Sequence, residues 1–121
     1  VERVKHFIPE QKIIGNKDAD LLVVGWGGTF GHLYSTVSNL VKEGKKVALA
    51  HFNYINPLPK NTETIFKKYK KIVVCELNRG QFVNHLRALF PDNKFEQYNK
   101  IQGLPFINTE LIHHFNKLLK K

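Results

Sequence analysis

Short apolar runs alternate with amphipathic helical segments along most of this chain, and this alternation constrains its fold more than any other feature. Three runs rich in Val, Ile and Leu have the length and composition of buried strands: Leu21–Val24, Val47–Phe52 and Ile72–Leu77. Helical segments follow them, and the first of these collects on one face Leu33, Val37, Leu40 and Val41. Short right-handed crossovers place such helices on both faces of a sheet. The sequence predicts a three-layer α/β/α domain with a mainly parallel sheet.

The segment boundaries have their own signals. Gly44 and Pro91 are expected to end helices, and Asn61 is expected to cap the helix that follows the second strand. Residues 95–101 predict a weaker strand at an edge of the sheet. A last helix is expected to begin at Asn108 or Thr109 and to be buried through Leu111, Ile112, Phe115, Leu118 and Leu119.

The size of the chain allows one real hydrophobic core. Its 121 residues are 42% hydrophobic and 24% charged, as in an ordinary globular protein. No apolar run approaches the length of a membrane span, no signal peptide is recognisable, and the single Cys75 cannot form an internal disulfide, so we expect a cytoplasmic protein without a membrane partner. The chain starts at Val1 and has no Met, and we interpret it as part of a longer polypeptide.

The charge balance is basic, with 19 Lys and Arg against 10 Asp and Glu. A net charge of +9 would suit an anionic partner. However, the lysines occur in pairs at the ends and outer faces of the expected helices, where a solvated surface is the ordinary explanation. No helix-turn-helix, aromatic RNA-binding motif or arginine cluster accompanies them, so nucleic acid is not an expected partner.

A glycine-rich turn between the first strand and its helix allows two interpretations. Backbone amides at Gly27, Gly28 and Thr29 could hold a phosphate at a helix N-terminus, which makes an independent small-molecule or phosphate-binding domain the alternative function, with coenzyme A as one candidate ligand. An NAD site would need Asp or Glu at the end of the second strand, but residues 51–53 are His, Phe and Asn. The other interpretation is a tight turn that packs the helix against the sheet.

Nucleophilic and metal chemistry are both weakly supported. Cys75 and His51, expected on neighbouring strands, could form a nucleophile and its base, but Cys75 lies inside an apolar run that is typical of an inert core thiol. His51 beside Asn56 or Glu76 is better explained as a hydrogen-bonded loop anchor. No pair with metal-ligand spacing occurs among His6, His32, His51, His85, His113 and His114.

Four motifs in series resemble the alpha subunit of 2-oxoacid:ferredoxin oxidoreductases: residues 25–31, 51–59, 76–82 and 100–106. The Asn-Pro-Leu-Pro form at residues 56–59 is closer to the 2-oxoglutarate type than to the pyruvate type. One departure is Gly28, where many relatives carry Ser. The resemblance implies a domain like the C-terminal domain of transketolase over residues 21–121, with residues 1–20 as an interdomain connection.

The resemblance also implies what the whole complex does. That family converts a 2-oxoacid, coenzyme A and oxidised ferredoxin into acyl-coenzyme A, carbon dioxide and reduced ferredoxin, using thiamine diphosphate, magnesium and a 4Fe–4S cluster. This chain carries none of the motifs that bind these cofactors. The matching domain of the family has a structural and assembly role, so the resemblance implies that this chain alone has no activity. The implied partners are upstream domains of the same subunit, the beta subunit and ferredoxin as electron acceptor.

Candidate contact residues lie in the loops after the first three strands. Parallel strands bring their carboxyl ends to one edge of the sheet, where ligands and partners bind. We expect interface or anion contacts there from Trp26, Gly27, Gly28, Thr29, His51, Asn56, Asn78, Gly80 and Gln81. A third interpretation, another thiamine enzyme of the transketolase superfamily, would be distinguished by what lies upstream of Val1.

Overall fold

A computed structural model describes residues 11–16, 18–26, 30–52, 58–76, 81–99 and 108–119 of the chain. Its centre is a five-stranded sheet in the order β1-β3-β2-β4-β5. The strands are β1 (Ile14–Gly15), β2 (Leu21–Trp26), β3 (Val47–Phe52), β4 (Lys71–Glu76) and β5 (Phe95–Asn99). Strands β2 to β5 pair in parallel, and β1 joins β3 antiparallel at one edge. The predicted edge strand is confirmed in β5, with residues 100 and 101 outside the described part.

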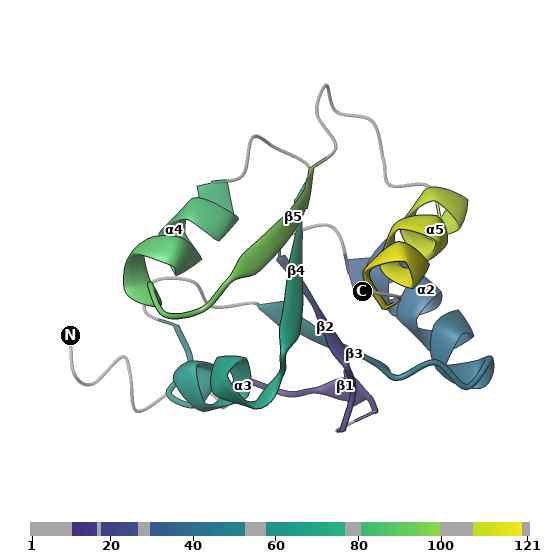
Figure 1. Ribbon diagram of the computed structural model, residues 1–121, viewed down its shortest axis with the longest axis horizontal. Coiled ribbons are helices and arrows are strands. Elements are labelled where there is room, and N and C mark those ends of the chain that lie inside the picture. The colour runs from purple at the N-terminus through teal and green to yellow at the C-terminus, as the bar shows by residue number, and fades with distance from the viewer. Residues whose placement is uncertain are drawn as a thin grey trace.

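Helices cover both faces of this sheet (Figure 1). They are α2 (Phe30–Lys42), α3 (Thr62–Lys68), α4 (Gln81–Leu89) and α5 (Asn108–Leu119). Figure 1 shows α2 and α5 on one side of the strands and α3 and α4 on the other. The α/β/α fold with a mainly parallel sheet is therefore confirmed.

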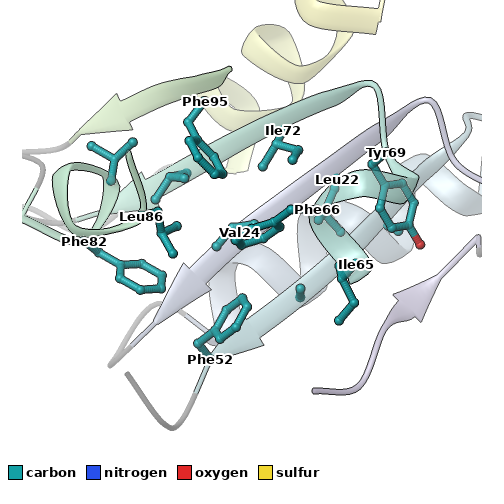
Figure 2. Packing of buried hydrophobic residues seen from close by; sticks show 14 of the residues in the cluster. Leu22, Val24, Phe52, Ile65, Phe66, Tyr69, Ile72, Phe82, Leu86 and Phe95 are labelled. Carbon is teal, nitrogen blue, oxygen red and sulfur yellow. The ribbon is translucent and has the colours of Figure 1, made fainter. Parts of the chain in front are cut away.

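Two hydrophobic clusters lie on the two faces of the sheet, because strand residues alternate between them. Beneath α3 and α4, aromatic rings fill much of the space, and Figure 2 shows Phe52, Phe66, Phe82 and Phe95 around the central strands. The Phe66 and Phe95 rings are 5.2 Å apart, near perpendicular. The other cluster joins α2 and α5 to the sheet through Leu33, Val37, Leu40, Leu111, Phe115 and Leu118. Nearly all residues of β2, β3 and β4 are buried on both faces, which explains why these strands are continuous apolar runs in the sequence.

The end of α2 has the backbone pattern expected from Gly44. The Lys45 N–H donates to the Leu40 carbonyl at 2.9 Å, and the Gly44 N–H donates to the Val41 carbonyl at 3.0 Å. Gly44 itself has φ +86°, a left-handed conformation that costs glycine little. This is a Schellman termination, and it sets the turn that leads into β3.

The segment before β2 is part of the folded unit. Besides forming β1, it is held by Asn61, whose side chain accepts the Gln11 N–H at 2.7 Å and donates to the Gln11 carbonyl at 2.9 Å. Asn61 does occupy the N-cap position of α3, but its side chain makes no capping hydrogen bond. The expected capping role is therefore wrong, because pairing with the Gln11 backbone uses the same amide. Residues 1–10 of the expected connection lie outside the described part.

None of the described helices is long and apolar enough to cross a membrane.

Candidate functional site

Strands β2, β3 and β4 end together at one edge of the sheet. Their register pairs Trp26 with Phe52, and it pairs Gly25 with both His51 and Cys75. Of the nine expected contact residues, Trp26, His51 and the backbone of Gln81 lie at this edge. The other six lie outside the described residues: Gly27, Gly28, Thr29, Asn56, Asn78 and Gly80.

The best-defined group at this edge is Glu76, the last residue of β4. Its side chain is completely buried, and its two carboxylate oxygens accept the Phe82 N–H at 2.7 Å and the Val83 N–H at 2.9 Å. The Trp26 indole N–H also donates to this carboxylate, at 3.3 Å. A buried carboxylate needs such donors, because an ionised group without them is very costly to remove from water.

These hydrogen bonds satisfy backbone N–H groups at the N-terminus of α4 with a carboxylate of the same chain. Phe82 and Val83 belong to the first turn of α4, whose free amides would otherwise attract an anion. Glu76 supplies that anion. Sequence reasoning named Glu76 only as a possible neighbour of His51 and missed its capping role. The available signal was an acidic residue at the end of a fully apolar strand, since such a residue requires paired donors.

Trp26 and His51 lie at the same edge but point to opposite faces of the sheet. The Trp26 ring packs near Phe82, with centroids 5.8 Å apart, and contacts the cluster under α3 and α4. His51 follows the alternation of Val47 and Leu49 toward α2, where its ring meets Phe30 edge-on at 5.1 Å. The His51 carbonyl accepts a 2.8 Å hydrogen bond from the Gln11 side chain. The expected neighbour Glu76 instead bonds Trp26 on the opposite side of the sheet, with β2 between its strand and that of His51, and Asn56 lies outside the described residues.

Cys75 is not placed to act as a nucleophile with His51. The expected neighbouring strands are in fact separated by β2, which places the two backbones roughly 9.5 Å apart, twice the strand spacing. Cys75 is fully buried, and burial, reinforced by the Glu76 carboxylate, raises the pKa of its thiol. The expected core position of Cys75 is confirmed, and a thiol in such a position is typically unreactive.

The described residues do not fit the metal groups that the resemblance implies for the complex. They contain no group of three His, Cys, Asp or Glu side chains that could hold a metal ion. The chain has one cysteine, whereas an iron–sulfur cluster needs several thiolates.

A sequence relative supports the resemblance found in the motifs. The chain is 35% identical over 94 residues to the 2-oxoglutarate oxidoreductase subunit KorA of Mycobacterium tuberculosis. The match covers 78% of this chain but 14% of that subunit, so the chain spans about one seventh of the relative's length.

Solved structures share the fold. A 2-oxoglutarate:ferredoxin oxidoreductase from Magnetococcus marinus, solved with 2-oxoglutarate, coenzyme A and succinyl-CoA bound, has a TM-score of 0.86 and 23% identity, covering 98% of this chain and 21% of its own. The alpha chain of a probable 2-oxoacid ferredoxin oxidoreductase from Thermoplasma acidophilum has a TM-score of 0.55 and 21% identity. The match covers 93% of this chain and 98% of the Thermoplasma chain.

The family assignment rests on a match over most of the chain. Residues 19–108 correspond to the family described as pyruvate:ferredoxin oxidoreductase core domain II. All four motifs lie within that range. The resemblance to 2-oxoacid:ferredoxin oxidoreductases is confirmed, and the chain belongs to the family of the pyruvate:ferredoxin oxidoreductase core domain II.

Proposed function

We propose that this chain is the structural and assembly domain of a 2-oxoglutarate:ferredoxin oxidoreductase. The observation that carries the proposal is the family match over residues 19–108, together with a sequence relative named for 2-oxoglutarate. The Glu76 network supports a packing role, because the amides at the start of α4 are bonded within the domain. The domain would hold its strand-end loops in place for a neighbouring part of the enzyme.

In this proposal the chemistry belongs to the rest of the complex. The assembly would form an acyl-coenzyme A, carbon dioxide and reduced ferredoxin from a 2-oxoacid, with thiamine diphosphate, magnesium and an iron–sulfur cluster bound elsewhere. Its partners would be the upstream domains, the beta subunit and ferredoxin. The contacts would come from Trp26, His51, Asn56, Asn78 and Gln81, since aromatic and amide groups make directional interface contacts.

The alternative of an independent phosphate-binding domain is less favoured. The family match over residues 19–108 and the sequence relative both point to a domain of a larger oxidoreductase, whereas an independent domain would depend on anion contacts from Gly27, Gly28 and Thr29. Titration of the purified chain with coenzyme A, NADP and nucleotides separates the two functions, because a packing domain should show no saturable binding.

The first test is an immunoprecipitation from the source cells with an antibody against this domain. We expect a thiamine-dependent, iron–sulfur oxidoreductase to be recovered with it, and we expect the double variant His51→Ala, Asn56→Ala to recover less partner protein. Recovery of a free 14.0 kDa chain without partners would overturn the proposal. A double variant that assembles and turns over like the wild type would exclude these two loops as contacts.

A further inference from the structure

We infer that the outer face of the first turns of α2, centred on Phe30 and Tyr34, is a docking surface for another folded domain of the same oxidoreductase. This inference rests on the proposed function and extends it, because neither Phe30 nor Tyr34 is among the nine residues expected to make contacts.

Two large aromatic side chains are exposed on this face. Phe30 is 41% exposed and Tyr34 is 46% exposed, and their rings stack at a centroid distance of 5.4 Å. The Phe30 ring also meets His51 edge-on, which connects the pair to the carboxyl edge of the sheet. Aromatic side chains of this kind are enriched in the cores of protein interfaces, where they bury much area with little loss of side-chain entropy.

The same face lacks charge in a strongly basic chain. Between Asp20 and Lys42 the sequence has no Asp, Glu, Lys or Arg, although 24% of the chain is charged. In contrast, the much shorter helix α3 carries Glu63, Lys67 and Lys68 on its solvated side. Burial of the inward face of α2 explains its apolar residues, but it does not explain why the exposed positions are uncharged as well.

The exposed aromatic rings and the lack of charge indicate which kind of partner this surface can bind. A charge-free aromatic face offers nothing to an anionic ligand, and depletion of charge marks the core of a protein interface. In the Magnetococcus marinus enzyme the matching fold is 21% of its chain, and in the Mycobacterium tuberculosis subunit it is 14%. A domain embedded in so much additional protein has large neighbours of its own. We therefore assign the surface to a neighbouring domain that presents apolar, uncharged side chains.

A cysteine probe can test this surface in the assembled enzyme, because the one thiol of this chain, Cys75, is buried, and mass spectrometry of the alkylated peptides separates the introduced thiols from those of the rest of the complex. We would introduce Tyr34→Cys and, separately, Gly31→Cys, since a Cβ at Gly31 meets nothing within 4 Å. The control is Thr64→Cys, at an exposed position of α3. In the native complex we expect alkylation at positions 34 and 31 to be at least about tenfold slower than at position 64, since burial in an interface limits access.

The outcomes distinguish this inference from the proposed function. A short cross-linker on the thiol of the Tyr34→Cys variant should capture a peptide from another domain of the oxidoreductase. Equal alkylation rates at all three positions in an intact complex would refute the docking surface while leaving the assembly role standing. Capture of a second copy of this domain would also refute it. If no oxidoreductase copurifies with the wild-type chain, the proposed function fails first.

Discussion

At the scale of single residues, Glu76 explains how a charged side chain is accommodated at the end of a fully buried strand. Its carboxylate accepts two backbone N–H groups of α4 and the indole N–H of Trp26. It therefore ties three pieces of the chain together: the end of β4, the start of α4 and the end of β2. Trp26 is the only tryptophan, so its fluorescence reports directly on this junction.

Glu76→Gln should destabilise the fold by about 2–3 kcal/mol, because an amide offers one acceptor oxygen and would turn an NH₂ group toward a backbone N–H. The free energy of unfolding in urea, followed by Trp26 fluorescence, measures the effect. Glu96→Gln is the matched control, since Glu96 is exposed on β5 and the same change there should be nearly neutral. Equal effects of the two changes would show that the Glu76 hydrogen bonds add no net stability.

At the scale of elements, the helices depend on local backbone signals as well as on the face they bury. Helix α2 ends where Gly44 takes a positive φ, and α5 is held near its end by Lys71, whose ammonium donates to the Leu118 carbonyl at 2.9 Å. Both features satisfy carbonyl groups that a helix C-terminus leaves without partners. Gly31 lies in the first turn of α2 and has no comparable constraint.

The glycines at the two ends of α2 should respond in opposite directions to the same substitution. Gly44→Ala should lower the free energy of unfolding by about 1 kcal/mol, because φ +86° is strained for a residue with a Cβ. Gly31→Ala should raise it by about 0.5 kcal/mol, since alanine loses less backbone entropy in a helix and the position is open. Urea unfolding of both variants gives the comparison. A stabilised Gly44→Ala variant would show that the Schellman turn is not required.

At the scale of the whole molecule, the thiol buried in the central strand β4 couples stability to alkaline pH. Burial and the neighbouring Glu76 carboxylate raise the pKa of Cys75 above its ordinary value of 9.0. Below pH 9 the thiol is protonated in both states and has no effect on the balance. Above pH 9 the unfolded chain releases this proton while the folded chain retains it, so stability falls as pH rises.

Cys75→Ala should remove this part of the pH dependence. Between about pH 9 and 10.5 the wild type should lose up to about 1.4 kcal/mol of stability per pH unit more than the variant does. Urea unfolding over that pH range compares the slopes, so any constant cost of the smaller side chain at position 75 cancels. Parallel slopes for the two proteins would show that the folded chain ionises Cys75 as readily as the unfolded chain.

The order and type of the main elements followed from the sequence alone. Short apolar runs and a helical period of 3.6 residues, with glycine and proline at the boundaries, identified β2 to β5 and the four helices of the described residues, because these signals are local and do not depend on distant partners. The family resemblance came from the sequence for a similar reason, since the strand-end motifs occur in a fixed order along the chain.

Only the tertiary structure decided how side chains find partners across the chain. Asn61 had the local pattern of a helix cap, but its amide pairs with Gln11, fifty residues away. Strand order separated Cys75 from His51, and it brought Trp26 to Glu76. Such choices depend on which strands are adjacent and which face each residue occupies. The order of the strands and the face that each residue occupies are set by packing of the whole sheet against its helices. Local propensity carries no information about either.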